Sequence, residues 1–380
     1  MLQGTLAPDS VPSTAREGLT SYANLNQIEV KPTRTAGYRL VINRIPTFTG
    51  QERRLAGQFI SELAAVVKLS AGDYESELIR AIPRRVVAAH LGGGKRLHSV
   101  LEQLETWSSQ TYEGQRIVAS IGLETIPAGT NIALQELWEE PFGPVLTNGF
   151  DTLLVVGSDS EIQGVQQLST SRVSSTAPYR LREVACWADG KRISVVLNQH
   201  GEILVFQNKS LRFARRSGNW LHYVHETNIR RMSPPGNRKL REAIYESCLD
   251  VSFARSGGCI GVVNQVQIDQ VSALVSPEDL LASLGTYKAR VISQVVGGDL
   301  FQSLDRRARS EMLSLDGAMI LDRDGRILCA GTIVNVPGGS VGGGGRTAAA
   351  VRLSTLGLGL KVSQDGTITG FRKGSQILKS

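Results

Sequence analysis

Cysteine is scarce in this 380-residue sequence, and its distribution excludes several kinds of site. The four cysteines, Cys186, Cys248, Cys259 and Cys329, lie far apart and form no C-x-x-C pair. A zinc knuckle, a redox motif or a disulfide framework requires paired cysteines. We therefore expect these four residues to be small, buried hydrophobic side chains.

Long apolar runs are also missing. No segment approaches the roughly 20 consecutive apolar residues that a membrane-spanning helix needs. The first residues, MLQGTLAPDSVPS, lack the basic and apolar blocks of a secretory signal. We therefore expect a cytoplasmic protein that has no membrane partner.

Acidic residues are outnumbered by basic ones, which gives a formal net charge of +7. A positive balance suits an anionic partner, but charge that is spread along the chain does not distinguish nucleotides, RNA and DNA. The densest basic cluster comprises Arg230, Arg231, Arg238, Lys239 and Arg241. It contains no aromatic residue on which a base could stack. The cluster therefore indicates a solvated helix start in preference to a nucleic-acid-binding module, so we do not expect a nucleic acid partner.

Four segments of the chain differ in composition and period. Residues 1–36 are polar and rich in Ser, Thr and Pro, which predicts a flexible N-terminal arm. Residues 37–175 combine helical apolar stripes with buried-strand runs, which predicts an α+β domain. Residues 176–236 show strand alternation and hairpin turns and end at MSPPGN, which predicts a small β-rich unit.

The last segment, residues 237–380, predicts an α/β domain with a mixed sheet flanked by helices. Asn237 is placed to cap a helix that ends before the strand CIGVV. Two buried strands follow in LDGAMILDRDGRILCAGTIV, joined by a tight turn. The glycine-rich stretch GGSVGGGGRTAAA, residues 338–350, then leads into a short helix that starts near Arg346. The strands LGLKVS and TITGF complete the order.

The glycine-rich stretch has two interpretations when only its spacing is considered. Glycine allows backbone N–H groups to approach an anion closely, and the free N–H groups at a helix start favour phosphate. Arg346 would add a planar fork of hydrogen-bond donors at that start. In the alternative, the glycines form a surface loop and Arg346 is a solvated cap. Spacing leaves both interpretations open.

The residues of this segment resemble the diadenylate cyclase (DAC) nucleotide-binding domain. LDGAMIL, residues 315–321, matches the Asp-Gly-Ala signature on its strand, and CAGTIV stands where the family runs along the adenine. GGRTAAAVRLS, residues 344–354, lies where the family has Gly-Thr-Arg-His-Arg-Ala-Ala and a helix. VSQDGTI, residues 362–368, replaces Val-Ser-Glu-Glu-Gly-x-Ile. The resemblance covers residues 240–380 and includes four motifs in the family's order.

The resemblance implies that residues of these motifs bind a nucleotide. They are Asp316, Gly317, Ala318, Gly331, Thr332, Gly344, Gly345, Arg346, Thr347 and Ser363. In the family, the Arg-His-Arg cluster grips the phosphates. The Asp of the signature and a downstream Glu serve the metal and the attacking 3′-hydroxyl.

The sequence departs from the family where catalysis would depend on charge. The Arg-His-Arg positions hold Arg346, Thr347 and Ala348, and the Glu-Glu pair is replaced by Gln364 and Asp365. Fewer cations and fewer metal ligands would stabilise the leaving pyrophosphate poorly. Nucleotide binding does not depend on that stabilisation, so it could survive these losses.

This pattern favours the degenerate, nucleotide-sensing type of the family, called DACNV, which is associated with bacterial signalling or anti-phage defence. We expect a sensor that binds an adenine nucleotide or cyclic dinucleotide, without catalytic residues or a metal, and with a homodimer or an effector protein as partner. The alternative that stays open is an active cyclase that makes cyclic di-AMP from two ATP. In that case Asp316 and Asp365 would hold Mg²⁺ or Mn²⁺.

Overall fold

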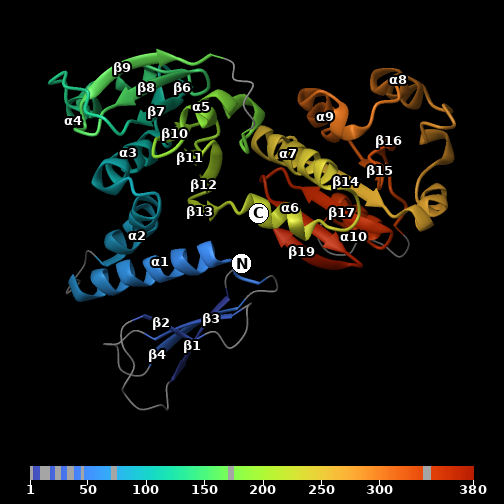
Figure 1. Ribbon diagram of the computed structural model, residues 1–380, viewed down its shortest axis with the longest axis horizontal. Helices are drawn as coiled ribbons and strands as arrows, with labels where there is room; N and C mark the ends of the chain where they lie inside the picture. Colours follow the sequence, from blue (N-terminus) through green and yellow to red (C-terminus); the bar gives the residue numbers. More distant parts are fainter. Residues whose placement is uncertain are drawn as a thin grey trace. The chain divides into compact units, whose positions relative to one another are not determined.

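The computed structural model describes residues 3–8, 18–21, 27–31, 38–43, 47–69, 75–169, 175–336 and 344–380 (Figure 1). The chain divides into two compact units. The first contains Met1–Ser175 and Leu181–Tyr223, and the second contains Thr176–Arg180 and Val224–Ser380. The short segment Thr176–Arg180 thus belongs to the second unit, although its chain neighbours on both sides belong to the first.

The N-terminal part of the first unit is a four-stranded antiparallel sheet with strand order β1-β4-β3-β2. Its strands are β1 (Gln3–Pro8), β2 (Gly18–Ser21), β3 (Gln27–Lys31) and β4 (Tyr38–Asn43). The sequence predicted a flexible arm over residues 1–36, and the structure describes three strands within that range. Each strand is only four to six residues long, so no sustained period marks it.

Three helices follow the small sheet in the chain. They are α1 (Gly50–Leu69), α2 (Glu75–His90) and α3 (Gly94–Trp107). The start of α1 is fixed by a reciprocal pair of hydrogen bonds. The backbone N–H of Thr49 donates to the Glu52 carboxylate at 2.7 Å, and the N–H of Glu52 donates to the Thr49 hydroxyl at 3.2 Å. This capping box satisfies donors that a helix start would otherwise leave without partners.

The core of the first unit is a seven-stranded sheet with strand order β13-β12-β11-β10-β7-β8-β9. The strands are β7 (Ala119–Leu123), β8 (Thr152–Val156), β9 (Ile162–Gln167), β10 (Ile193–Leu197), β11 (Ile203–Gln207), β12 (Ser210–Arg216) and β13 (Asn219–His222). A two-stranded ribbon, β5 (Thr111–Tyr112) with β6 (Gln115–Arg116), and the helices α4 (Leu134–Glu139) and α5 (Arg182–Trp187) lie in the connections. The helices α3 and α5 pack on this sheet.

The strands that the sequence placed in a separate β-rich unit, residues 176–236, lie in this sheet. Strand β10 is hydrogen-bonded to β7 in antiparallel register, so β10 to β13 extend the sheet that β7 to β9 begin. Hairpin signals identify neighbouring strands only, and the pairing of β10 with β7 joins residues at least 70 positions apart. The first unit ends at Tyr223, ahead of the boundary expected at residue 236.

The second unit is built on a six-stranded sheet with strand order β16-β15-β14-β17-β18-β19. The strands are β14 (Gly258–Val263), β15 (Ala318–Asp322), β16 (Ile327–Thr332), β17 (Gly357–Val362), β18 (Ile368–Arg372) and β19 (Ser375–Lys379). The helices are α6 (His225–Arg231), α7 (Arg238–Ala254), α8 (Tyr287–Val296), α9 (Arg306–Leu313) and α10 (Gly345–Ser354). Helix α10 packs on β14 and β17, and α7 runs above the same sheet beside α9 (Figure 1).

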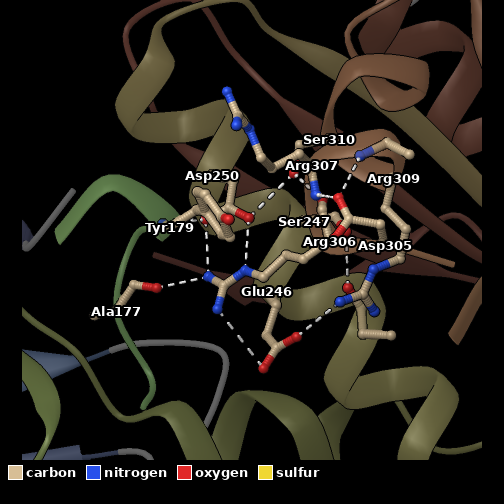
Figure 2. A network of polar contacts seen from close by, with 12 residues as sticks. Ala177, Tyr179, Glu246, Ser247, Asp250, Asp305, Arg306, Arg307, Arg309 and Ser310 are labelled. Carbon is tan, nitrogen blue, oxygen red and sulfur yellow. Dashed lines mark hydrogen bonds and ion pairs between the residues drawn. The ribbon is translucent and has the colours of Figure 1, made fainter. Parts of the chain in front are cut away.

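A buried polar network holds the segment Thr176–Arg180 in the second unit (Figure 2). The Arg306 guanidinium donates to both carboxylate oxygens of Asp250 at 2.8 Å and to the Ala177 carbonyl at 2.6 Å. Asp250 also accepts from the backbone N–H of Tyr179 at 2.7 Å. The side chains of Arg306 and Asp250 are only 11% and 7% exposed, so this pair is screened little by solvent.

The two large sheets share one topology. In each, the first strand pairs in parallel with the second, as β7 with β8 and β14 with β15. The third strand is antiparallel to the second, and the fourth is antiparallel to the first. One helix precedes the first strand, and another lies between the third and fourth: α3 and α5 in one sheet, α7 and α10 in the other.

Equivalent residues in the later strands of the two sheets are separated by a constant 165 positions. The turn before β11 reads NQHGEI over residues 198–203, and the turn before β18 reads SQDGTI over residues 363–368. A bulge in the next strand pairing begins after Val205 in the first sheet and after Gly370 in the second, again 165 residues apart. The second unit is therefore a structural repeat of the seven-stranded sheet.

The structure confirms the expected α/β class and the burial of three of the four cysteines. Both units mix helices with sheets, as the predicted α/β class requires. In the part of the chain that the structure describes, no helix combines the length and the apolar character needed to cross a bilayer. The four cysteines are free thiols; Cys248, Cys259 and Cys329 are buried, whereas Cys186 is half-buried.

Candidate functional site

The site lies where α10 begins, on the face of the six-stranded sheet that α10 covers. Two glycines of the sheet allow the helix to pack closely. A Cβ at Gly261 would lie 2.9 Å from the Leu353 side chain, and one at Gly359 would collide with the Ala350 carbonyl oxygen. The absence of side chains at these two positions therefore allows the body of α10 to pack directly on β14 and β17.

The first turn of α10 presents backbone donors. Gly344 precedes the helix with φ of +81°, a conformation that glycine adopts without strain. Its carbonyl accepts from the N–H groups of Thr347 and Ala348 at 3.0 and 3.2 Å. In the described part of the chain, no acceptor is found for the N–H groups of Gly345 and Arg346. Free N–H groups at a helix start favour an anion. Residues 338–343, which the sequence also assigned to this glycine-rich loop, lie outside the described residues.

Arg346 lies over a glycine on the neighbouring strand end. A Cβ at Gly257 would stand 2.5 Å from Nη1 of Arg346, so only glycine leaves room for the guanidinium there. Nη2 of Arg346 lies 4.0 Å from Oδ1 of Asp316. The Arg346 side chain is 29% exposed, whereas that of Asp316 is 97% exposed. A cation held against the sheet and a solvated carboxylate therefore stand side by side at this site.

These residues border a cavity of about 400 Å³. Its lining combines polar groups with apolar side chains, as in many small-molecule sites, which range from about 300 to 1,000 Å³. The lining residues are Cys259, Asp316, Gly317, Ala318, Thr332, Ile333, Val334, Val336, Gly345, Arg346, Ala348 and Ala349. The cavity is large enough for a substantial part of a nucleotide.

Six of the ten residues assigned from the sequence line this cavity. They are Asp316, Gly317, Ala318, Thr332, Gly345 and Arg346. Gly344 and Thr347 flank Gly345 and Arg346 in the chain. Gly331 precedes Thr332, and its carbonyl accepts from Nζ of Lys288 at 2.6 Å.

Ser363 and Asp365 are not among the lining residues. They build the turn between β17 and β18, in which the N–H of Ser363 donates to the Thr367 carbonyl at 2.9 Å. The N–H of Thr367 donates to Oδ1 of Asp365 at 2.9 Å, and this bond holds the pKa of that carboxyl below its usual value. Asp316 is thus the single carboxylate in the cavity lining. Asp365, which the cyclase alternative pairs with Asp316 at a metal, is therefore not brought into the lining of this cavity.

Sequence reasoning missed several lining residues, among them Cys259. Burial raises the pKa of the Cys259 thiol to about 12, against the opposing positive charges of Arg346 and Lys361. The thiol is therefore neutral and acts as an apolar wall. Strand alternation could have found this position, because Cys259 and Gly261 lie two residues apart on the α10 face of β14.

The first sheet carries a larger side chain at a position that lines the cavity in the second. The register places Leu153 where the second sheet has Ala318. Gly122 is equivalent to Gly261, and a Cβ there would collide with Leu153 and Trp187. Leu153 is fully buried and Trp187 nearly so. Of the two repeats, the second carries the small residues that shape the site.

Two arginines of the basic cluster near residue 236 make contacts within the protein. Arg238 donates to Glu226 at 2.8 Å and to Glu242 at 2.7 Å. Arg241 donates to the carbonyl of Gly236. Arg230 and Lys239 are exposed.

The similarity found between this chain and known proteins is weak. The chain matches no protein-family model and no curated protein. Among solved structures it is similar to a double mutant of DacA from Staphylococcus aureus, with 18% sequence identity and a TM-score of 0.26. That similarity covers 37% of this chain and 87% of the other.

Proposed function

We propose that the second unit binds an adenine nucleotide or a cyclic dinucleotide and that the protein acts as a nucleotide sensor. The observation that carries this proposal is the cavity at the start of α10. It joins a helix N-terminus with free N–H groups, the Arg346 guanidinium and a wall of small apolar side chains. The polar end suits a phosphate, and the apolar wall suits a base.

Sensing is favoured over synthesis by the charges at the site. Joining two ATP molecules requires cations and metal ligands around the leaving pyrophosphate. Here the cavity lining holds one arginine and one carboxylate, and Asp365 is engaged in its own turn. Binding a preformed nucleotide needs only the groups that are present. In this role the domain would report nucleotide levels in bacterial signalling or anti-phage defence, through an effector or a second copy of the chain.

The first experiment identifies the ligand. Mass spectrometry of the purified full chain should detect a co-purified adenine nucleotide or cyclic dinucleotide. Calorimetry with that compound then compares Arg346→Ala with Arg352→Ala, a control in the last turn of the same helix. We expect Arg346→Ala to weaken binding by about 1.5 to 3 kcal/mol and Arg352→Ala to change it little. Equal affinities in both variants and the wild type would refute the assignment of the site.

A further inference from the structure

Lys361 lies on β17 beside the candidate site. On the face of β17 that carries Lys361, the earlier positions of the strand are glycines. In the pairing of β14 with β17, Lys361 stands directly opposite Cys259, which lines the cavity. Residues directly opposite one another in an antiparallel pair share a face of the sheet. The preceding positions on that face of β17 are Gly357 and Gly359. Lys361 is therefore the first side chain of β17 to reach the start of α10.

Its ammonium group is held at the first turn of the helix. Nζ of Lys361 donates to the Thr347 hydroxyl at 2.8 Å, and the side chain is half-buried. Among the described residues, no carboxylate lies within 4.0 Å of this Nζ, unlike Lys288, which pairs with Asp279 at 3.2 Å. A partly buried ammonium costs free energy to desolvate unless an anion compensates it. The charge of Lys361 therefore stands beside the free N–H groups of α10 without an ion pair, and Asp365, on the turn after β17, is the carboxylate that feels its charge at longer range.

The structural repeat offers an internal comparison. In the first sheet, Val196 pairs with Ser120 as Lys361 pairs with Cys259 in the second. Val196 is fully buried, and in the same repeat Leu153 stands at the position where Ala318 lines the cavity of the second. The lysine thus occurs in the repeat that has the cavity, and an apolar residue replaces it in the repeat with the larger leucine.

We propose that Lys361 is a specificity-determining residue that, together with Arg346, recognises the phosphate charge of the ligand. This inference rests on the proposed nucleotide-binding function. Arg346 approaches from the helix, and Lys361 approaches from the strand below it, so the two cations flank the first turn of α10. Both contribute positive potential at the same wall, because both act on the Cys259 thiol. Affinity should therefore rise with the number of phosphates on the ligand, and Lys361 should account for part of that rise.

The test compares ATP with adenosine as probes, using calorimetry on the full chain at one fixed salt concentration. Lys361→Met removes the charge but keeps an unbranched side chain, and Lys361→Arg keeps the charge. Lys379→Met, at an exposed position on β19 of the same unit, is the matched control. We expect Lys361→Met to weaken ATP binding about ten- to hundred-fold and to leave adenosine binding within about twofold. Lys361→Arg should retain most of the affinity for ATP.

The failures are distinguishable. If Lys361→Met and Lys379→Met bind ATP equally well, the role of Lys361 is refuted while nucleotide binding by the wild type stands. Equal losses for ATP and adenosine would show that Lys361 only supports the fold of the first turn, which also refutes the proposal. If the wild type binds neither ATP, cyclic di-AMP nor adenosine, the proposed function fails, and the inference about Lys361 fails with it.

Discussion

Replacing Gly257 with alanine tests whether Arg346 acts from the position described here. A Cβ at residue 257 would stand 2.5 Å from Nη1 of Arg346 and 3.3 Å from the Val362 carbonyl oxygen. The carbonyl belongs to a paired strand, whereas the guanidinium ends a flexible side chain. The added methyl group should therefore displace the guanidinium and leave the sheet in place.

Gly257→Ala should lower both the stability of the second unit and its affinity for the ligand, each for a different reason. Gly257 has φ of +71°, where a side chain costs about 1 to 2 kcal/mol of stability. Displacing Arg346 should also cost about 1.5 to 3 kcal/mol of binding, or roughly ten- to hundred-fold in Kd. Because both substitutions act through one guanidinium, the double variant Gly257→Ala with Arg346→Ala should bind no more weakly than Arg346→Ala alone.

The matched control is Gly374→Ala, in the turn between β18 and β19. Gly374 has φ of +76°, but a Cβ there would meet no atom within 4 Å, so this variant shares the backbone cost without the collision. Calorimetry with ATP gives the affinities, and thermal unfolding gives the stabilities. The reasoning is refuted if Gly257→Ala binds ATP as tightly as Gly374→Ala, or if the binding losses of the Gly257 and Arg346 variants add.

Two further predictions concern stability and reactivity. Asp250→Asn should lower the free energy of unfolding of the second unit by about 3 to 5 kcal/mol, because it removes the closest carboxylate of the buried Arg306 cation and leaves, among the described residues, only Glu246, at 3.9 Å. Glu242→Gln, which removes an exposed ion pair on the same helix, should cost less than about 1 kcal/mol. Hydrogen exchange in increasing urea measures the free energy of unfolding of both variants. Equal losses of stability in the two variants would contradict the account. Burial raises the pKa of the Cys259 thiol to about 12, so iodoacetamide at about pH 8 should label half-buried Cys186 well before Cys259. Peptide mapping that found Cys259 labelled first would show that the thiol is not buried as described.

Much of the second unit could be predicted because its signals are local. Asn237 caps α7 by accepting from the N–H of Leu240 at 2.9 Å, as expected of that residue type at a helix start. The tight turn between β15 and β16 and the short helix at Arg346 were also found where turn and glycine chemistry placed them. Each of these features depends on residues within a few positions of one another.

Features that depend on distant pairing could not be predicted in this way. Alternation marks Lys361 as a strand residue, but only the pairing of β17 with β14 places it opposite Cys259. Ser363 was expected at the nucleotide site and Asp365 only in an active cyclase; both follow the same strand and make hydrogen bonds within their own turn. The similarity of the two turns can be seen in the sequence, because NQHGEI and SQDGTI lie 165 residues apart. That both turns belong to sheets of the same topology follows only from the strand pairings of the fold.

The most direct test of the nucleotide-sensor proposal is to incubate the purified full chain with ATP and Mn²⁺ and to quantify both bound nucleotide and product by mass spectrometry. The account predicts saturable binding of a single nucleotide per chain, weakened in Arg346→Ala, and no cyclic di-AMP above background. Multiple turnovers of ATP to cyclic di-AMP, abolished by Asp316→Asn, would contradict it and establish the chain as a cyclase.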